Sequence, residues 1–423
     1  MRDFLPADKT RRERVLAVIR ERYRSHGFDE IETPVLEEYG RLHAGIGGDN
    51  EKLAFNILKR GLDADAVRAV ADAPSLDVAA LADLGLRYDL TVPLARFYAS
   101  HRAELPTVFR SIQIAPVWRA ERPQKGRYRQ FMQCDIDIIG DASARAEAEL
   151  IVASLDTLDA LGLEGGTIRI NDRRLLDAML DVFGFAVDER PGVLITIDKL
   201  DKIGPTGVAA ELRERGATTA AVDAFERFLA GVAGREDRPF GEHQIRAALP
   251  EGVPDEIIAH LVGLGETVAA ARGAGGEIPL VFDPFLVRGM GYYTGTIFEL
   301  AHPSVTYSLG GGGRYDGMIG RFLGQDVPAV GFSIGFERIV DLLAASVDAE
   351  GASVVLVHDR DVPVAELLAH KTFFVASGAR VRLEQRTKNL KGLLERAAND
   401  GYTAFATLPA GATPGELEVK PLG

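Results

Sequence analysis

The chain has 423 residues, of which 46% are hydrophobic and 26% charged, and its net charge of −13 argues against a general nucleic-acid binder but leaves room for local basic patches. At roughly 100–200 residues per domain, this length predicts two or three domains. The single cysteine, Cys134, excludes an intramolecular disulfide and indicates a reduced, cytoplasmic setting, and we expect neither a signal peptide nor a membrane span, because no long apolar run occurs.

The first predicted elements are a helix and an interrupted strand. Residues 8–26 predict a helix that Asp8 can cap, with Val15, Ile19 and Tyr23 on one face at helical spacing. Residues 27–36 then predict a strand that Pro34 interrupts. Since proline has no backbone donor, we expect Pro34 at a sheet edge, a bend or an interface.

A β-hairpin is the clearest prediction of the sequence, over residues 108–138. Along its second strand, 131–138, polar and apolar side chains alternate. Phe131, Gln133, Asp135 and Asp137 therefore share one face, which we expect to be available to a ligand while the other packs on a core. The loop between the strands carries five basic residues against one acidic residue: Arg119, Arg122, Lys125, Arg127 and Arg129, against Glu121. A second basic group lies further along, at Arg382, Arg386, Lys388 and Lys391.

The remaining chain predicts an inserted helical region and a second, smaller domain. After a helix over 144–162, helix-like segments with Gly and Pro breaks occupy the region up to 275. Strand patterns return, followed by a change of composition at 348–352 that predicts a linker. Strands and helices alternate after it, which favours a small α/β domain. The predicted strands are 279–287, 292–300, 329–334, 354–357, 381–383 and 403–408, and the predicted helices are 317–322, 336–345, 363–377 and 390–400.

Two segments in the first half of the chain suggest ligand chemistry. At the end of a strand, Arg119 would form a phosphate clamp, because its guanidinium matches phosphate oxygens, and Phe131 could stack on a base. In Arg87–Pro93, we interpret Asp89 and Thr91 as an acid and a hydroxyl on one strand face, which suits an ammonium group. The alternatives are a solvated hairpin with a charged loop and an edge strand before a proline.

Three later segments combine glycine with arginine or tyrosine. In 286–295, Arg288 precedes closely spaced glycines and tyrosines, and glycine permits close backbone approach to a ligand. The run 310–317 lacks the spacing of a P-loop or a dinucleotide fingerprint but suits a pocket floor. In 331–338, Arg338 lies in the first turn of a helix, where the dipole favours an acid, so a ligand-facing role is plausible. The alternatives are a tight turn with core tyrosines, a flexible loop and a surface arginine. No cluster has metal-ligand spacing.

In this order, the segments resemble the histidyl-tRNA synthetase family, a class II family, over nearly the whole chain. Pro34 resembles the motif 1 proline, 117–133 resembles motif 2 with its loop, and 331–338 resembles motif 3. The segments 286–299 and 312–317 resemble the family's two histidine signatures. The resemblance extends to the eukaryote-like branch of this family, whose sequences are similar to this chain at Asn171–Asp177 and Ile197–Lys202.

The resemblance implies a class II catalytic domain of the α+β type on an antiparallel sheet. It would comprise 1–165, with motifs 1 and 2, and 276–347, with the histidine signatures and motif 3. An inserted, mainly helical region would occupy 166–275, and a small anticodon-binding-like α/β domain would occupy 353–423. The resemblance also implies a cytoplasmic homodimer that takes histidine, ATP with Mg²⁺ and tRNA(His), with no protein-bound metal.

The family's residue roles carry over position by position. Arg119 would hold the α-phosphate of ATP, Arg338 would lie across the adenine from Phe131, Glu121 would orient ATP, and Arg288 would stabilise charge as the histidine carboxylate attacks. The residues implied to bind histidine are Asp89, Thr91 and Gln133 at the ammonium group, with Asp137, Tyr292, Tyr293 and Tyr315 at or near the imidazole. Arg122 and Gln124 would meet the tRNA acceptor end.

Two departures from the family pattern affect these expectations. Gly291 stands where the family commonly has an acid, which bears on one imidazole contact, and the short C-terminal domain would reduce anticodon contacts. Two other functions remain alternatives. One is a paralogue that activates an amino acid without tRNA. The other is a non-catalytic regulatory subunit of ATP phosphoribosyltransferase, which characteristically lacks the C-terminal domain and the full arginine set.

Overall fold

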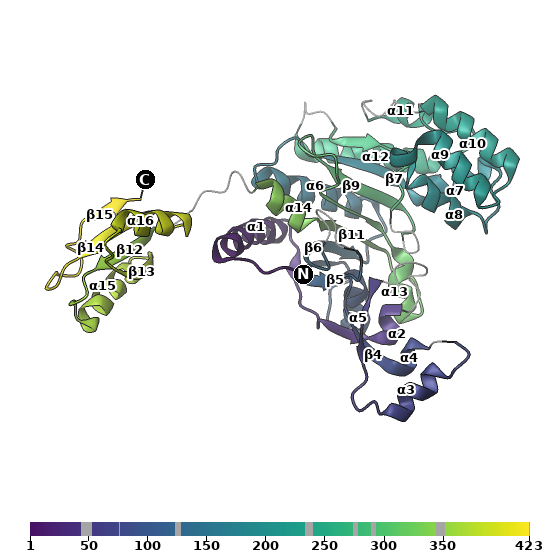
Figure 1. Ribbon diagram of the computed structural model, residues 1–423. Coiled ribbons are helices and arrows are strands. Elements are labelled where there is room, and N and C mark those ends of the chain that lie inside the picture. The colour runs from purple at the N-terminus through teal and green to yellow at the C-terminus, as the bar shows by residue number, and fades with distance from the viewer. Residues whose placement is uncertain are drawn as a thin grey trace. The chain divides into compact units, whose positions relative to one another are not determined.

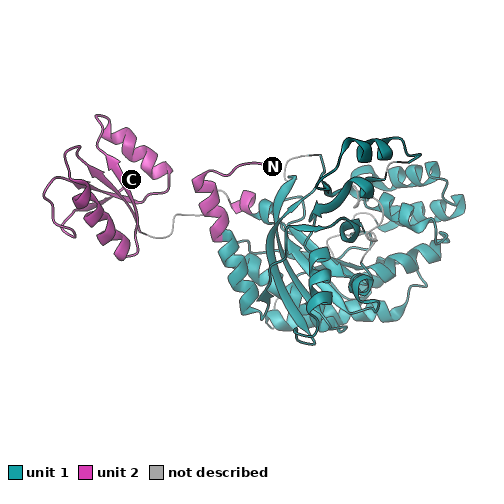
Figure 2. Cartoon of the chain, turned by 90° about the horizontal axis from the view of Figure 1, so that it is seen from below, with its two compact units in different colours: residues 1, 15–339 teal, residues 2–14, 340–423 magenta. Residues whose placement is uncertain are grey.

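The computed structural model describes residues 1–43, 53–75, 77–122, 128–232, 240–273, 278–288, 293–343 and 352–422. The chain forms two compact units (Figure 2). The first unit contains Met1 and Val15–Ile339, and the second contains Arg2–Arg14 and Val340–Gly423.

An eight-stranded sheet is the framework of the first unit (Figure 1). Its strands follow the order β1-β5-β6-β11-β10-β9-β7-β8. All neighbouring pairs are antiparallel except β1 with β5 and β7 with β8. The strands are β1 (Asp29–Glu30), β5 (Phe109–Trp118), β6 (Gln130–Ile139), β7 (Thr167–Asp172), β8 (Leu280–Phe282), β9 (Thr296–Ala301), β10 (Gly310–Arg314) and β11 (Ala329–Ile334). This confirms the expected α+β fold with a mainly antiparallel sheet.

The predicted hairpin is confirmed and lies within this sheet. β5 and β6 pair antiparallel over their full length, from Phe109 opposite Ile139 to Trp118 opposite Gln130. Side chains alternate across a strand, so Gln133, Asp135 and Asp137 share one face of β6. All three are buried, although each is polar. A polar strand face that is buried in this way must be matched by other polar groups or by a ligand.

Helices cover the sheet and carry the site-forming loops. Helix α6 (Ala144–Ala160) packs on β6 and β11, and α12 (Asp255–Arg272) packs against α6. Helix α5 (Thr91–His101) packs against α13 (Asp316–Leu323). Two further helices are α1 (Pro6–Ser25) and α14 (Phe336–Leu343).

The region predicted as an insertion is mainly helical in its described part and lies at one end of the sheet (Figure 1), and its hydrophobic core also includes Ile297 of β9. Phe225 lies in this core in edge contact with Phe183, Phe185 and Phe285. Leu286 and Val287, which directly precede Arg288, are buried in the same core. Besides α12, the region's helices are α7 (Arg173–Phe183), α8 (Arg190–Ile197), α9 (Leu200–Glu214), α10 (Thr219–Val232) and α11 (Glu242–Ala247).

A small three-stranded sheet precedes α5 and was not predicted. It has the order β2-β4-β3 and antiparallel pairing throughout. Its elements and their short helices are β2 (Leu36–Glu38), α2 (Tyr39–His43), β3 (Phe55–Leu58), α3 (Ala64–Ala71), α4 (Val78–Leu81) and β4 (Ala82–Leu86).

The C-terminal part of the second unit is an α/β fold, as expected. Its sheet has the order β13-β12-β14-β15, with parallel pairing of β12 to β13 and β14. The last strand, β15, is antiparallel and was not predicted. The elements are β12 (Ser353–His358), α15 (Val364–Ala376), β13 (Arg380–Gln385), α16 (Leu390–Asn399), β14 (Ala404–Leu408) and β15 (Val419–Pro421). The predicted linker, 348–352, falls largely outside the described residues.

Several local predictions were wrong. The first helix begins at Pro6, so Asp8 lies inside its first turn and is not the cap, although Val15, Ile19 and Tyr23 are buried as predicted. The expected strand over 27–36 is two short strands, β1 and β2, in different sheets, with Pro34 between them. Residues 167–172, expected to belong to the inserted, mainly helical region, form β7 of the large sheet.

Candidate functional site

A cavity of about 440 Å³ lies in the first unit. Its walls come from the β5–β6 hairpin, the segment before α5, β10, β11 and the start of α14. Eleven of the predicted site residues line it: Asp89, Thr91, Arg119, Glu121, Phe131, Gln133, Asp137, Arg288, Tyr293, Tyr315 and Arg338. These residues span some 250 positions of sequence, and the fold brings them to one place.

One side of the cavity is acidic. Asp137 accepts a hydrogen bond of 2.6 Å from the Tyr315 hydroxyl. The Gln133 side-chain amide donates to Asp135 and, at 3.2 Å, to the Ser333 hydroxyl, while its Oε1 is buried with no hydrogen-bond partner among the described residues. A buried acceptor without a partner is costly unless a ligand supplies a donor. This side therefore suits a ligand with N–H groups.

Burial raises the pKa of the carboxyl groups on this side. The pKa of Asp89 rises to about 6 because it is desolvated, although the backbone N–H of Val92 and the charge of Arg119 partly oppose the rise. Burial raises the pKa of Asp137 to about 7, and the Tyr315 hydrogen bond opposes this. The pKa of Asp135 is raised well above its ordinary value by burial and by the neighbouring charge of Asp137. Clustered buried acids favour a cationic ligand, which would stabilise their charged forms.

Substitution of Asp137 by asparagine should change how stability depends on pH. Its folded pKa of about 7 lies above the unfolded value of about 3.9. The folded state therefore holds a proton that the unfolded state releases, and stability falls as pH rises from about 4 through 7, by up to about 4 kcal/mol. The introduced amide cannot ionise, but its oxygen can still accept from Tyr315. We expect Asp137→Asn to raise the unfolding temperature of the unliganded protein more at pH 8 than at pH 5.

The control for this experiment is Asp83→Asn, at an exposed position of β4. Thermal unfolding of the three proteins at both pH values gives the comparison. An equal shift for Asp137→Asn at pH 5 and pH 8 would show that Asp137 is not held protonated by burial.

A second side of the cavity combines arginine with aromatic rings. Arg119 follows β5, where its Nε donates to the Tyr88 carbonyl at 3.0 Å and its guanidinium carbon lies 5.1 Å from the centre of the Phe131 ring. Arg338, in the first turn of α14, donates to the Ser308 carbonyl. Arg119 thus lies over the Phe131 ring, and Arg338 lies over the ring of Tyr307. Two permanently charged guanidinium groups near aromatic rings suit a phosphate group attached to a flat base.

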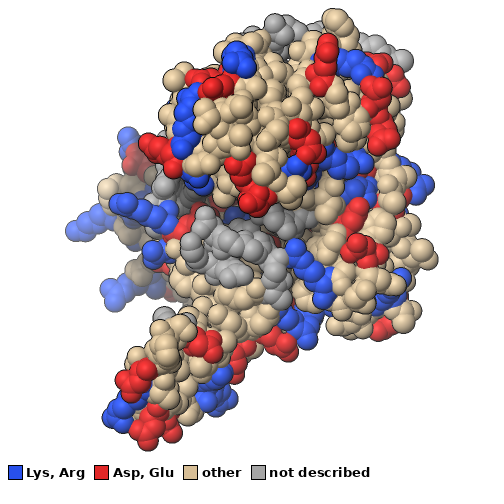
Figure 3. Space-filling view, turned by 90° about the vertical axis from the view of Figure 1, so that its right-hand side faces the viewer, with Lys and Arg blue, Asp and Glu red and all other residues tan. Residues whose placement is uncertain are grey.

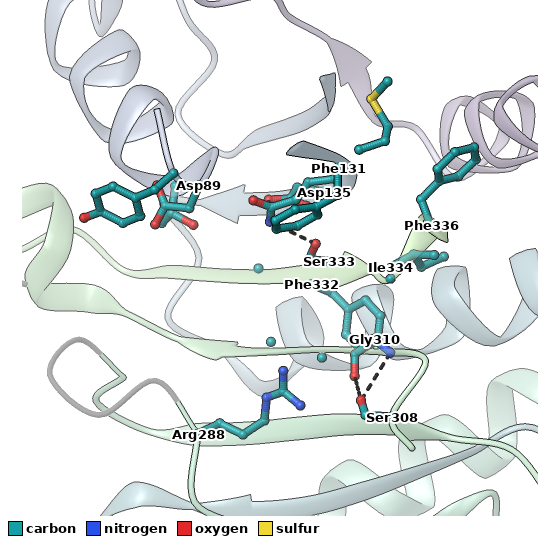
Figure 4. A pocket seen from close by; sticks show the side chains of 18 of the residues that line it. Asp89, Phe131, Asp135, Arg288, Ser308, Gly310, Phe332, Ser333, Ile334 and Phe336 are labelled. Carbon is teal, nitrogen blue, oxygen red and sulfur yellow. Dashed lines mark hydrogen bonds between the residues drawn. The ribbon is translucent and has the colours of Figure 1, made fainter. Parts of the chain in front are cut away.

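Arg288 reaches into the cavity from the side opposite Asp89 and Asp135 (Figure 4). Its guanidinium lies directly over Gly311 of β10, where an added Cβ would stand 2.5 Å from the guanidinium carbon. Close approach of the same kind occurs on β11, where a Cβ at Gly331 would stand 1.9 Å from Oδ1 of Asp137. The two glycines thus leave room for the Arg288 guanidinium and the Asp137 carboxylate against the strand backbone. The run 310–313, for which a flexible loop was an alternative, is itself a sheet strand.

The structure corrects one interpretation, and it does not place three of the predicted site residues in the cavity. Asp89 and Thr91 do not share a strand face: Asp89 lies in the segment before α5, and Thr91 is the first residue of that helix. The Asp89 carboxylate accepts from the backbone N–H of Val92 at 3.2 Å. Arg122 is exposed and does not line the cavity. Gln124 and Tyr292, like Gly291, lie outside the described residues.

Asp135, Ser333 and Glu337 are among the lining residues that had no role predicted from the sequence. Asp135 could have been found, since it lies between Gln133 and Asp137 on the predicted polar face. Ser333 lines the cavity from β11, and the Glu337 carboxylate accepts from the backbone N–H of Met132 at 3.2 Å. Both come from the motif 3-like segment, where the sequence singled out only Arg338.

Three comparisons with known protein sequences point to the same family. A family model described as histidyl-tRNA synthetase matches residues 1–339. A histidine–tRNA ligase of Leifsonia xyli subsp. xyli is 60% identical over 428 residues, covering 100% of this chain and 97% of that protein. A probable histidine–tRNA ligase of Tropheryma whipplei (strain Twist) is 42% identical over 434 residues, covering 100% and 98%.

Solved structures agree in fold. The crystal structure of histidyl-tRNA synthetase from Nostoc sp. PCC 7120 has a TM-score of 0.76 at 24% identity, covering 100% of this chain and 93% of that one. A structure from Bacillus halodurans C, described as an ATP phosphoribosyltransferase regulatory subunit/histidyl-tRNA synthetase, has a TM-score of 0.74 at 21% identity, with 97% of each chain covered. In the described part of this chain, no helix is both long and apolar enough to span a membrane.

Proposed function

The chain belongs to the histidyl-tRNA synthetase family, and from this premise we propose how its cavity activates histidine with ATP and passes it to tRNA(His). The observation that carries the proposal is the convergence of buried acids and two tyrosines on one side of a single cavity with Arg119, Arg288 and Arg338 around it. Such a cavity matches a substrate with two basic nitrogen groups beside a nucleoside triphosphate.

We assign the acidic side to histidine. Asp89, Thr91 and the unpartnered Oε1 of Gln133 accept from its α-ammonium group. Asp137 accepts from an imidazole N–H, and its bond to Tyr315 holds it in place for that purpose. Tyr293 also lines this cavity and contributes to the same subsite, to which we also assign Tyr292. A polar subsite of this kind rejects apolar side chains, because its buried donors and acceptors would then lose their partners.

The arginine side receives ATP. Arg119 binds the α-phosphate, and the adenine lies between Phe131 and Arg338. Glu121 orients the nucleotide, and Mg²⁺ enters with ATP, for which the carboxylates of Glu121 and Glu337 are suitable oxygen ligands in the same cavity.

The chemical step is an in-line displacement at phosphorus. The histidine carboxylate oxygen attacks the α-phosphorus, and the bond to the bridging oxygen of pyrophosphate breaks, leaving histidyl-adenylate and pyrophosphate. Positioning and positive charge are the main contributions that a protein makes to such a step. Arg288, opposite the acids that hold histidine, is placed to stabilise the negative charge that develops.

The tRNA-binding parts lie outside the cavity. We propose that the hairpin loop, with Arg122 and Gln124, meets the acceptor end, and that residues 353–423 contact the anticodon. The catalytic domain would then be 1–165 and 276–347, and 166–275 the insertion. On the face seen in Figure 3, basic and acidic side chains are interspersed, so phosphate contacts would be local. A cytoplasmic homodimer, with Pro34 near its interface, completes the proposal.

Arg122→Ala is expected to separate the two half-reactions. Because Arg122 is exposed and does not line the cavity, ATP–pyrophosphate exchange should keep its rate. Loss of one phosphate contact should lower kcat/KM for tRNA(His) charging about tenfold. Both rates are measured on the same preparation. A fall in exchange would place Arg122 in activation, and unchanged charging would remove it from the tRNA contact.

A further inference from the structure

Arg288 is held by a carboxylate that does not itself line the cavity. Nη1 of Arg288 donates to Oε2 of Glu299 at 2.5 Å. Glu299 lies on β9 directly opposite Gly311 of β10, the glycine over which the guanidinium lies. Arg288 lines the cavity, whereas Glu299 stands behind it and is largely buried, its side chain being 18% exposed.

The other oxygen of Glu299 is shared with a second arginine. Nη1 of Arg169 donates to Oε1 of Glu299 at 3.3 Å, and Arg169 lies opposite Glu299 on β7. The same guanidinium binds Asp283 and lies 3.9 Å from the carboxylate of Asp201, near the start of α9. A row of ion pairs therefore crosses the sheet from Arg288 through Glu299 to Arg169. It ends at Asp201 of α9 and at Asp283, which follows β8.

The backbone that leads to Arg288 is fixed by the same strand, β7. The side-chain amide of Asn171, two residues beyond Arg169, donates to the carbonyls of Pro284 and Leu286 at 3.1 and 3.2 Å. Leu286 and Val287 are buried in the helical core of the inserted region. The backbone that precedes Arg288 and the guanidinium of Arg288 are thus both held by side chains that do not line the cavity.

We propose that Glu299 is a positioning residue for the activation step and that Arg169 tunes it. This inference rests on the proposed role of Arg288. Glu299 fixes a long side chain that would otherwise sample many rotamers, which lowers the barrier by preorganisation. A carboxylate beside a catalytic arginine also offsets its positive charge. Arg169 divides the charge of Glu299 between two guanidinium groups, so Arg288 keeps its positive potential toward the reacting phosphate.

Glu299→Gln is the direct test. An amide cannot accept from both arginines, because its NH₂ group must face one of them. We expect kcat for histidine-dependent pyrophosphate exchange to fall about 30-fold, while KM for histidine and ATP changes less than about threefold. The matched control is Glu149→Gln, which breaks a similarly half-buried pair with Arg110 away from the cavity and should leave kcat unchanged.

A double-mutant cycle distinguishes positioning from a structural role. If Glu299 acts through Arg288, adding Glu299→Gln to Arg288→Ala should cause no further loss of kcat. Additive losses would overturn the inference, as would unchanged kcat in Glu299→Gln. If Arg288→Ala alone retained full exchange, the proposed catalytic role would fail first, which is a separate outcome.

Arg169→Met is a second test of the proposal, which keeps Glu299 in place. It can be used if the Glu299→Gln variant does not fold. The carboxylate would then act on Arg288 alone, and we expect kcat to fall about fivefold with both KM values retained. Unchanged kcat in this variant would remove Arg169 from the proposal and, if Glu299→Gln does not fold, would overturn it.

Discussion

Replacement of Arg288 by alanine is expected to lower kcat for histidine-dependent ATP–pyrophosphate exchange by about 10³-fold. The side chain enters the cavity opposite Asp89 and Asp135 (Figure 4), and its charge is needed most when negative charge spreads over the reacting phosphate. An interaction made mainly in the transition state changes kcat more than KM. The measurement is steady-state exchange with histidine and ATP each varied.

A matched control separates this effect from a loss of folding. Arg272 is exposed to a similar degree as Arg288, 32% against 30%, and makes one ion pair, with Asp159, on the surface of α12. Arg272→Ala should retain full exchange. If Arg288→Ala retained more than about a tenth of the kcat while remaining folded, charge stabilisation would have to come from another group.

Asp89→Asn is expected to lower kcat/KM for histidine by about 10²–10³-fold, mainly through KM. When a buried carboxylate that faces an ammonium group is replaced by a neutral amide, most of the electrostatic attraction between the two groups is lost. Asparagine keeps an oxygen that can accept from the N–H of Val92, as Asp89 does, so the start of α5 should be preserved. The variant therefore tests the charge rather than the local fold.

Exchange kinetics and histidine binding by calorimetry measure this effect. KM for ATP should change less than about threefold, and Asp83→Asn, on the exposed side of β4, should match the unsubstituted protein. A large rise in the KM for ATP with an unchanged KM for histidine would assign Asp89 to the nucleotide instead.

The elements that could be predicted from sequence are those with a strong local pattern. Polar and apolar side chains alternate along 131–138, most of β6, and β11 was predicted at its observed bounds, 329–334. Val15, Ile19 and Tyr23 recur at helical spacing because one face of α1 is buried. In α1 the periodicity of the chain and the burial of the side chains agree.

The elements that were missed depend on contacts distant in sequence. β2 has only three residues and β3 four, and their pairing with β4 leaves no long alternation. Glycine is depleted in strands, so a run of four glycines does not predict β10. In β10, the missing side chain at Gly311 leaves room for the Arg288 guanidinium, as Gly331 of β11 does for Asp137. Pro93 suggested the end of a strand, whereas proline is also tolerated in the first turn of a helix, as in α5.

The candidate site was predicted better than its surroundings. The resemblance to a family supplied the residues expected to contact substrates, and eleven of these line one cavity. It did not supply Asp135, Glu299 or Arg169. Their arrangement depends on which strands are neighbours, and the order β10-β9-β7 cannot be read from any local segment.

The most direct test of the central claim is ATP–pyrophosphate exchange measured with each of the twenty amino acids in turn, for the unsubstituted chain and for Arg288→Ala. The acids and tyrosines of the cavity predict exchange with histidine alone, which the substitution lowers about 10³-fold, and charging of tRNA(His) by the unsubstituted protein. Exchange with an amino acid other than histidine, or no exchange with any of the twenty, would contradict the proposal that this cavity activates histidine.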